Sequence, residues 1–250
     1  MQHFVIFITI VCLFACNERP KKLTEISGKQ LPITDSIVDT DTVDKFITPY
    51  RKHINEVLDS ALAYAPSAIT KDDGKFNTSA GNLMADIVMS EANPIFKSRT
   101  GQNIDFVILN FGGIRSIISK GKVSERTAYE VMPFDNSIVV VALKGKSVRD
   151  LISFLINAKR PNPIAGIQII LNKNGKLQDL NIQGKPFDEN KKYYIATSDY
   201  LAKGGDDMGF FSDGLNSVDL NYMIRNAMID YFKKIDTLRA EVDDRFIIIE

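Results

Sequence analysis

The segment 105–111, DFVILNF, is an almost unbroken apolar run, and it leads into two glycines and an arginine. Such a run is typical of a strand that is buried in a sheet. Gly112 and Gly113 allow the backbone to turn sharply or to approach a ligand closely, and Arg115 can hold a phosphate or a carboxylate through paired hydrogen bonds. The sequence therefore predicts a buried sheet with an anion-binding turn at the end of one strand.

Helix-like and strand-like segments are interleaved along the rest of the chain. Apolar residues at helical spacing predict helices over 43–62, 146–158 and 218–234, and Ser79 is the expected N-cap of a further helix that Pro94 ends. Strands are predicted over 136–145 and 245–249, with a hairpin over 166–184. Since these segments do not follow a strict βαβ alternation, the predicted class is α+β, with a mixed β-sheet flanked by helices.

The charge balance limits the partners of this chain. Lysine and arginine together number 31, as do aspartate and glutamate, and the pI is about 6.8. Nonspecific binding to nucleic acid needs a broad positive surface, which this composition does not supply. We therefore expect no nucleic-acid partner, and any anion site must be local.

The N-terminus has the character of an export signal. The apolar run from Phe4 to Cys16 is too short to span a bilayer, and its end, LFAC, resembles the lipobox of bacterial lipoproteins. We expect a signal peptide at 1–15, a lipid anchor on Cys16, a tether over 16–40 and a domain over 41–250, held at a periplasmic or cell-surface membrane face. Because 1–3 contains no Lys or Arg, a plain cleaved signal or a single anchor helix is the alternative.

The expected mature chain is poor in histidine and cysteine. Cys12 and His3 lie in the segment expected to be removed, which leaves His53 as the only histidine. A hydrolytic dimetal centre usually draws on several His and Asp ligands. We therefore expect no metal site, no cofactor and no catalytic residue on this chain, with His53 on a helix surface.

Three loops at the ends of predicted strands carry side chains suited to a ligand. The stretch 110–115 offers Asn110 and Arg115, 132–137 offers Phe134, and 198–211 offers Tyr200 and Asp206. Together these are two aromatic faces, an amide, a guanidinium and a carboxylate. That set matches the flat base, the vicinal ribose hydroxyls and the anionic tail of a nucleoside phosphate.

These loops belong to an ordered series of motifs over nearly the whole of 41–250, namely AGNLMAD, ILNFGGIR, VMPFDNSIVVVALKG, GIQIILNKNGKL and ATSDYLAKGGDD. The series resembles the C-terminal substrate-binding domain of the 5′-nucleotidase and UDP-sugar hydrolase family. Members of that family also have an N-terminal metallophosphoesterase domain with a dimetal centre. Residues 17–40 are far too few to contain such a domain.

The resemblance implies roles for the loop residues. Phe134 and Tyr200 would stack on the two faces of the base, and Asn110 would bond its edge. Asp206 would accept hydrogen bonds from the ribose hydroxyls, and Arg115 would contact the phosphate or ribose side. Gly112 and Gly113 would shape the turn and bring its backbone to the ligand.

The chain also departs from the family pattern. The arginine that the family has upstream of the GNL helix has no clear counterpart here, and Lys75 is the nearest cation. Loss of that arginine should weaken the binding of the phosphate more than the binding of the base. Asp135 and Asp207 stand where relatives more often have glycine, and they add negative charge near the expected anion site.

Three functions are compatible with these observations. The first is a split 5′-nucleotidase, in which this chain binds a nucleotide or nucleoside and a separate metallophosphoesterase chain supplies the divalent metals. The second is a free-standing surface lipoprotein that binds nucleotides or nucleosides without a hydrolase role. The third is a relic whose pocket no longer binds. For the split enzyme, the helix predicted over 43–62 is the candidate docking element.

Overall fold

The computed structural model describes residues 22–23, 25–32, 34, 41–158 and 160–249. The predicted signal peptide and lipid-anchor residue Cys16 lie outside these residues. The chain divides into the units Met1–Thr48 and Pro49–Glu250. Among the described residues, no helix combines the length and the apolar character that a membrane span requires.

A five-stranded mixed sheet lies at the centre of the unit Pro49–Glu250, as far as the structure describes it. Its order is β10 (Asn216–Met223), β4 (Ser137–Lys144), β9 (Lys192–Ser198), β2 (Phe106–Ile108) and β5 (Ile164–Ala165). Strand β2 runs parallel to β9, and the other neighbouring pairs are antiparallel. The predicted α+β class with a mixed sheet flanked by helices is confirmed.

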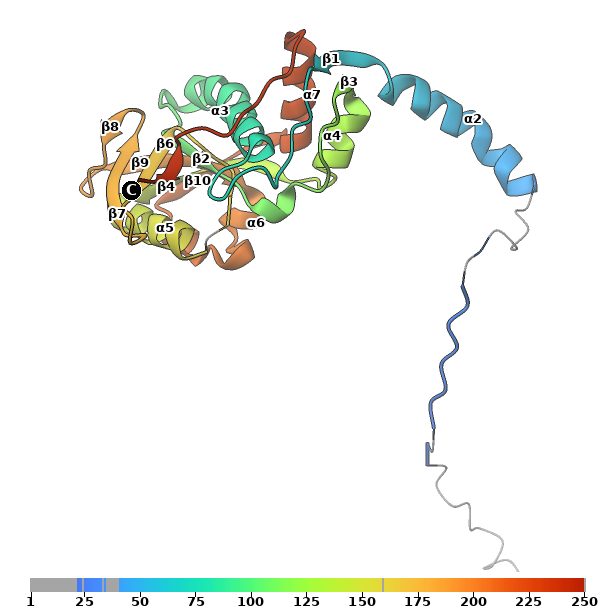
Figure 1. Cartoon of the computed structure of the whole chain (residues 1–250), viewed down its shortest axis with the longest axis horizontal. Helices are drawn as coiled ribbons and strands as arrows, with labels where there is room; N and C mark the ends of the chain where they lie inside the picture. The colour runs from blue at the N-terminus through green and yellow to red at the C-terminus, as the bar shows by residue number, and fades with distance from the viewer. Residues whose placement is uncertain (1–21, 24, 33, 35–40, 159, 250) are drawn as a thin grey trace, which may run out of the picture. The chain divides into compact units, whose positions relative to one another are not determined.

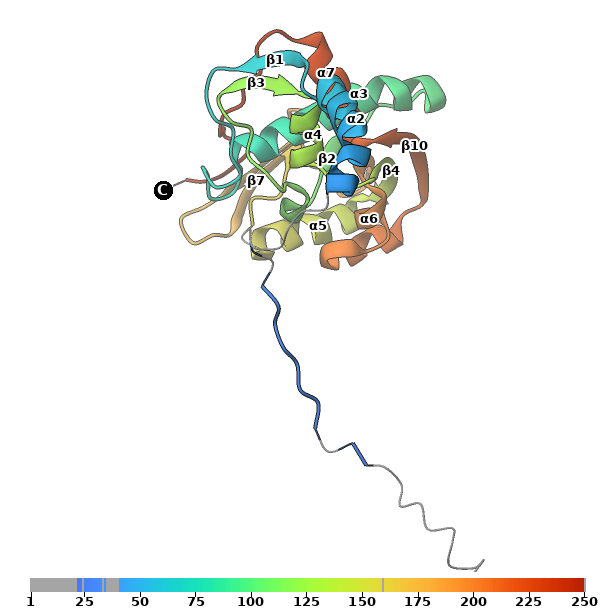
Figure 2. The ribbon, with the colours of Figure 1, turned by 90° about the vertical axis from the view of Figure 1, so that its right-hand side faces the viewer.

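Both faces of this sheet are covered, which explains the unbroken apolar run of its central strands. Alternate residues of β2 point to opposite faces: Val107 packs in one hydrophobic cluster and Phe106 with Ile108 in another. The first cluster includes residues of α3 (Ser79–Thr100) and α7 (Ile224–Lys234), and the second includes residues of α5 (Gly145–Ala158). Figures 1 and 2 show α3 and α5 on opposite sides of the strands.

Smaller sheets extend this centre. Strand β11 (Phe246–Ile248) runs parallel to β6 (Ile167–Leu171), which forms the predicted hairpin with β7 (Leu177–Ile182), and β8 (Lys185–Pro186) follows. Gly175, in the turn of the hairpin, has φ 72°, the left-handed conformation that glycine adopts without strain. Helix α4 (Glu125–Val131) precedes the loop that carries Phe134, and the short α6 (Asp199–Ala202) carries Tyr200, which the sequence placed in a loop.

The first long helix is shorter than the sequence predicts. Helix α2 covers Asp41–Leu58, and the chain then forms β1 (Ala61–Ala65), which pairs with β3 (Gly121–Ser124). The predicted helix over 43–62 was therefore wrong at its C-terminal end. In β1 the buried Ala63 and Ala65 alternate with the exposed Tyr64, a period of two that small alanines did not reveal in the sequence.

The helix after Ser79 was predicted correctly as a helix, but both of its predicted ends were wrong. Its N-cap is Thr78, whose hydroxyl accepts a hydrogen bond from the Gly81 N–H at 3.1 Å. The helix continues through Pro94 to Thr100. Beyond the proline, Phe96 is buried, and its ring lies 5.3 Å from that of Tyr194. Burial of this ring favours continuation enough to offset the single backbone hydrogen bond that a proline removes.

The final predicted helix, over 218–234, is in fact a strand followed by a helix. Strand β10 covers Asn216–Met223, and only Ile224–Lys234 is helical. Apolar side chains at 218, 220 and 222 alternate along the strand, and Leu220 is buried. Because an edge strand interrupted by a register shift shows only a short alternation, the sequence was misread as helical.

Candidate functional site

Three loops meet at one edge of the central sheet and enclose a cavity of about 350 Å³. Strands β2 and β9 are parallel, so both end at this edge, and β4 begins there because it runs antiparallel to β9. Binding sites often form outside the ends of such strands. The cavity is lined by Asn110, Gly112, Gly113, Arg115, Phe134, Asn136, Tyr200 and Asp206.

The structure thus brings together all the predicted site residues except Lys75. Residues 110–115 follow β2, Phe134 lies between α4 and β4, and Tyr200 with Asp206 follows β9. Sequence positions up to 96 residues apart are in direct contact, since Asn110 hydrogen-bonds Asp206. The roles predicted for these residues remain predictions.

Asp206 lies at the centre of a hydrogen-bond network. Asn110 Nδ2 donates to Asp206 Oδ2 at 2.7 Å, and the Tyr200 hydroxyl donates to Oδ1 at 2.9 Å. The backbone of Asp206 has φ 51°, in the left-handed region that Asp tolerates better than most residues. Since each carboxylate oxygen has two lone pairs, both oxygens can still accept a hydrogen bond from a ligand hydroxyl.

Tyr200 presents an exposed ring to the cavity, with 45% of its surface accessible. A Cβ at Gly205 would lie 2.5 Å from atoms of this ring, so the glycine lets the ring lie directly against the backbone. The hydrogen bond to the Asp206 carboxylate raises the pKa of the Tyr200 hydroxyl, because the phenolate could not donate it. Tyr200 therefore stays neutral and remains a donor at physiological pH.

Phe134 and Arg115 form another part of the wall. Phe134 is 42% exposed, and the Arg115 guanidinium carbon lies 6.0 Å from its ring centroid, at the outer limit of a cation–π contact. The Arg115 backbone N–H donates to Val131 O at 2.9 Å, which ties the glycine turn to the end of α4. An aromatic face and a positive charge are thus available side by side.

Lys75 does not line this cavity, so its predicted place near the anion site was wrong. Its ammonium lies 5.1 Å from the centroid of the Phe76 ring, and it borders a separate groove with Val242 and Phe246. The lysine that reaches the glycine turn is Lys71, whose Nζ donates to Ile114 O at 3.0 Å and lies 4.7 Å from the Phe111 ring centroid. Only the packing of this loop distinguishes the two lysines, which lie four residues apart.

Asn136 was also missed by the sequence analysis, although it stands two residues after Phe134. Its place in the PFDN segment was the available signal. Asn162 was missed as well: it is buried, and its Oδ1 accepts a hydrogen bond from the Phe111 N–H at 3.0 Å. It supports the start of the glycine turn from outside the cavity.

Asp135 and Asp207, the two aspartates that depart from the family pattern, lie in different surroundings. Asp135 is not among the cavity-lining residues, and its Oδ1 lies 2.5 Å from Arg225 Nη2. Asp207 lines a neighbouring cavity of about 270 Å³ with Phe111 and Phe154. The expected charge penalty is therefore reduced at Asp135, because a guanidinium lies directly against it.

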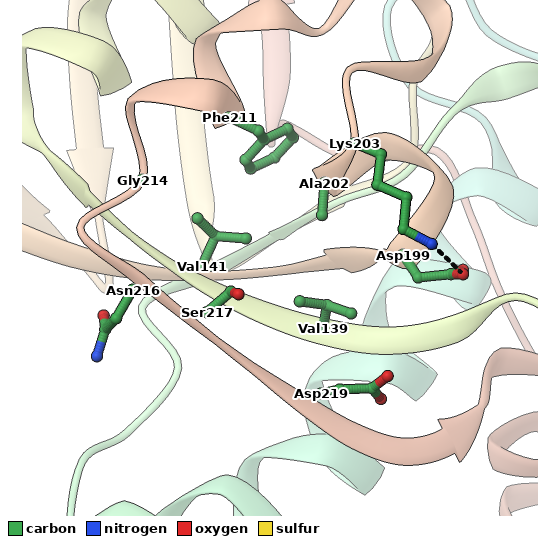
Figure 3. Close-up of a pocket in the computed structure, with 10 residues that line it drawn as sticks. All are labelled: Val139, Val141, Asp199, Ala202, Lys203, Phe211, Gly214, Asn216, Ser217 and Asp219. Carbon is green, nitrogen blue, oxygen red and sulfur yellow. Dashed lines mark ion pairs between the residues drawn. The ribbon is translucent and has the colours of Figure 1, made fainter.

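A further cavity, of about 360 Å³, lies between β4, α6 and β10, and Figure 3 shows its lining residues. Val139, Val141 and Phe211 are apolar members of its wall, and Lys203 pairs with Asp199 at 3.6 Å. Asp199 Oδ1 also accepts the Ser137 N–H at 3.1 Å. That bond ties the helix carrying Tyr200 to the first residue of β4.

The site carries no arrangement suited to a metal. Within the part of the chain that the structure describes, no group of three or more His, Cys, Asp or Glu side chains is placed to hold a metal ion. His53 is an exposed residue of α2. The described residues therefore do not fit the dimetal centre that the family resemblance implies for the other domain.

Comparison with known proteins identifies the same family. The family model for the 5′-nucleotidase C-terminal domain matches residues 61–213. Protein UshA of Escherichia coli K12 is 26% identical over 228 residues, which cover 89% of this chain and 40% of UshA. The 5′-nucleotidase of Vibrio vulnificus is 26% identical over 231 residues, covering 85% and 40% of the two chains.

A solved structure shows the same fold. The crystal structure of a 5′-nucleotidase precursor from Thermus thermophilus matches with a TM-score of 0.69 at 21% identity, over 83% of this chain and 43% of that one. The chain thus spans about 40% of the length of the curated relatives it matches. Since the family model covers more than half of the sequence, the chain belongs to the 5′-nucleotidase C-terminal domain family.

Proposed function

We propose that this chain is the nucleotide- or nucleoside-binding part of a split 5′-nucleotidase, and that a separate metallophosphoesterase chain supplies the divalent metals. The observation that carries the proposal is that Phe134, Tyr200, Arg115 and Asp206 line one cavity of about 350 Å³. The size and the residue types suit a nucleoside with an anionic tail.

In this proposal the base stacks between the rings of Phe134 and Tyr200. Asp206 accepts hydrogen bonds from the ribose hydroxyls, and Arg115 takes the phosphate or ribose side with the backbone of Gly112 and Gly113. Asn110 bonds the base edge, for which its amide offers a second N–H and an oxygen besides the N–H that it donates to Asp206. Asn136 is the other amide on the wall, and we assign a second contact with the base edge to it.

The need for a second chain follows from the chemistry of phosphate-ester hydrolysis by this family. The described residues offer no group of three or more His, Cys, Asp or Glu side chains placed to hold a metal ion. A metal pair activates water and stabilises the leaving oxygen, whereas the residues that line the cavity include one carboxylate, Asp206, and no histidine. We therefore place the metals and the hydrolytic step on a partner.

The location of the protein belongs to the same proposal. The LFAC sequence that ends at Cys16 supports export, followed by lipidation of Cys16. The tether over 16–40 would then hold the domain near a periplasmic or cell-surface membrane face, where extracellular nucleotides are available.

The alternative is a free-standing lipoprotein that binds nucleotides or nucleosides and has no hydrolase role. It is compatible with the cavity, since two aromatic rings, a guanidinium and a carboxylate of the described residues line it together. The two proposals differ in whether the bound nucleotide is hydrolysed when a metallophosphoesterase chain is added.

Binding is tested by isothermal titration of the purified protein with AMP, adenosine and UDP-glucose. Because stacking contributes about 1–3 kcal/mol per base, a Phe134→Ala/Tyr200→Ala variant should bind at least about tenfold more weakly. Tyr64→Ala, which removes an exposed aromatic ring outside the cavity, is the matched control. Equal affinities in the wild type and the double variant would refute the stacking site.

Hydrolysis is tested separately. The purified protein with Mn²⁺ should not release phosphate from AMP, and the release should begin when a lone metallophosphoesterase chain encoded beside it is added. Nucleotide binding without any stimulated release would favour the free-standing binder, and no binding at all would favour the relic.

A further inference from the structure

The loop that carries Phe134 is fixed by the first residues of α7. This loop, residues 132–136, connects α4 to β4. The Ile224 N–H donates to Asn136 O at 3.0 Å, and Arg225 Nη1 donates to Phe134 O at 3.2 Å and more weakly to Met132 O at 3.4 Å. The backbone carbonyls of residues 132, 134 and 136 thus all accept hydrogen bonds from the N-terminal end of α7.

Arg225 is buried to an unusual degree for an arginine, with only 7% of its surface exposed. Its guanidinium carbon lies 4.3 Å from the centroid of the Tyr129 ring, which covers one face of the group. Its Nε has no hydrogen-bond partner in the described part of the chain. The guanidinium thus lies between the Tyr129 ring of α4 and the loop 132–136, and its Nη1 and Nη2 bond the loop.

Asp135 completes this arrangement from the outside. Its side chain is 75% exposed, yet its Oδ1 lies 2.5 Å from Arg225 Nη2. The residue next to Phe134 therefore bonds the same guanidinium that bonds the Phe134 carbonyl. Arg225 thus bonds the backbone before Phe134, at Met132 O, and after it, at Phe134 O and the Asp135 side chain.

The Phe134 ring is partly exposed to the cavity. It is 42% exposed, and the one ring contact seen among the described residues is the distant Arg115 guanidinium, at 6.0 Å. The backbone that carries the ring is held by the Arg225 hydrogen bonds, and it limits the directions that the ring can take. A stacking ring that is fixed before the ligand arrives loses less conformational entropy on binding.

We propose that Arg225 and Asp135 are positioning residues that fix Phe134 against the cavity, and that they raise the affinity for the base without touching the ligand. This inference rests on the proposed binding function. It also gives a reason for the aspartate in the PFDN segment, which the sequence alone suggests is unfavourable to an anion. The two interpretations of Asp135 predict opposite effects of removing its charge.

The first test is Asp135→Ala, since this exposed side chain can be removed without opening the core. If Asp135 positions Phe134, adenosine and AMP should both bind about threefold to tenfold more weakly, by the same factor. Asp150→Ala, which removes an exposed carboxylate from α5, is the control for net charge. A gain in AMP affinity with adenosine unchanged would show that Asp135 acts only by repulsion and would overturn the inference.

The effect must also depend on the ring. In a Phe134→Ala background, Asp135→Ala should cause no further loss of adenosine affinity, because there is no longer a ring to position. Additive losses would overturn the inference. Arg225→Lys keeps the positive charge but loses the planar guanidinium that bonds the loop carbonyls, so it should weaken adenosine binding. Its midpoint of thermal unfolding should stay near that of a second variant, Arg225→Met.

A readout without ligand separates this inference from the binding proposal. The chain contains no tryptophan, so Phe134→Trp places a single fluorophore on the loop. Adding Asp135→Ala should lower the fluorescence anisotropy of this residue and increase its quenching by acrylamide. Unchanged anisotropy and quenching would overturn the positioning role even if adenosine binds. Failure of the wild type to bind, with a clear effect on the fluorophore, would overturn the binding proposal alone.

Discussion

Asp206 is held in a left-handed conformation by hydrogen bonds that leave its carboxylate facing the cavity. Tyr200 and Asn110 each donate to one of its oxygens, and Gly204, two residues before it, has φ 88°. Residues with positive φ at 204 and 206 form a tight turn that brings Gly205 against the Tyr200 ring and Asp206 to its hydroxyl. The ring, the carboxylate and the amide therefore act as one unit, and a change in one member should be felt at the others.

The Tyr200 hydroxyl should remain protonated well into the alkaline range. Its pKa is raised because it donates to the Asp206 carboxylate, so this hydrogen bond stabilises the fold below about pH 10 and loses its contribution as the pH rises above the folded-state pKa. We expect the adenosine affinity to stay constant from about pH 7 to about pH 9. In Asp206→Asn, NMR titration of ¹³C-labelled tyrosine should show Tyr200 titrating at lower pH than in the wild type.

The two outcomes that would count against this account are distinct. A fall in adenosine affinity between about pH 7 and about pH 9 would show that another group controls binding. An unchanged Tyr200 titration in Asp206→Asn would show that the hydrogen bond is not the source of the raised pKa.

The sequence could predict which residue types form the site, but not which of two similar residues reaches it. Phe134, Tyr200 and Asp206 were predicted from their loops, and the structure places them on one cavity. Lys75 was predicted there, while Lys71 contacts the glycine turn. The side chain of a loop residue points where the local packing sends it, and no periodicity constrains a loop as it does a helix.

At the scale of elements, the same helical period leads to different environments. In α5 the apolar Val148, Leu151 and Leu155 are buried in the core. In α2 the apolar Ile54 and Val57 are each 50% exposed. The period predicts an amphipathic helix in both cases, but only the tertiary structure shows which apolar face is covered. Similarly, β2 and β4 were predicted because both faces are buried, whereas β1 was missed because it is a short strand in a two-stranded sheet.

If the split-enzyme proposal holds, the apolar face of α2 is the surface that should receive the partner. A charged residue within an apolar contact is costly to desolvate, so Ile54→Asp or Val57→Asp should reduce the partner-dependent release of phosphate from AMP at least about tenfold. Adenosine affinity should not change, since neither residue lines the cavity. Lys52→Ala, at an exposed charged position of the same helix, is the control.

These variants separate docking from folding. A loss of adenosine affinity together with phosphate release would mean that the substitution disturbed the domain itself. Full phosphate release by both aspartate variants would exclude this face of α2 as the docking surface.

At the scale of the whole molecule, the cavity is a product of topology. Residues near 110, 134 and 200 meet because β2 and β9 end, and β4 begins, at the same edge of the sheet. The strand signals were present in the sequence, but the strand order was not, because it depends on which apolar faces pack together. The two rings, the guanidinium and the carboxylate thus come to line one cavity. If the split-enzyme proposal holds, recognition and hydrolysis should be separable.

This separation predicts how the purified protein responds to the removal of metals. Because no metal-holding group of side chains occurs in the described residues, adenosine and AMP should bind with the same affinity, within about twofold, before and after treatment with EDTA. Titration calorimetry in the two buffers measures this directly, and Arg115→Ala serves as a variant that weakens AMP binding by a route independent of metal. A marked loss of AMP affinity in EDTA, restored by Mn²⁺, would place a metal between this chain and the phosphate. Release of phosphate from AMP by the purified protein, abolished in Arg115→Ala, would place the hydrolytic centre itself on this chain and end the proposal of a split enzyme.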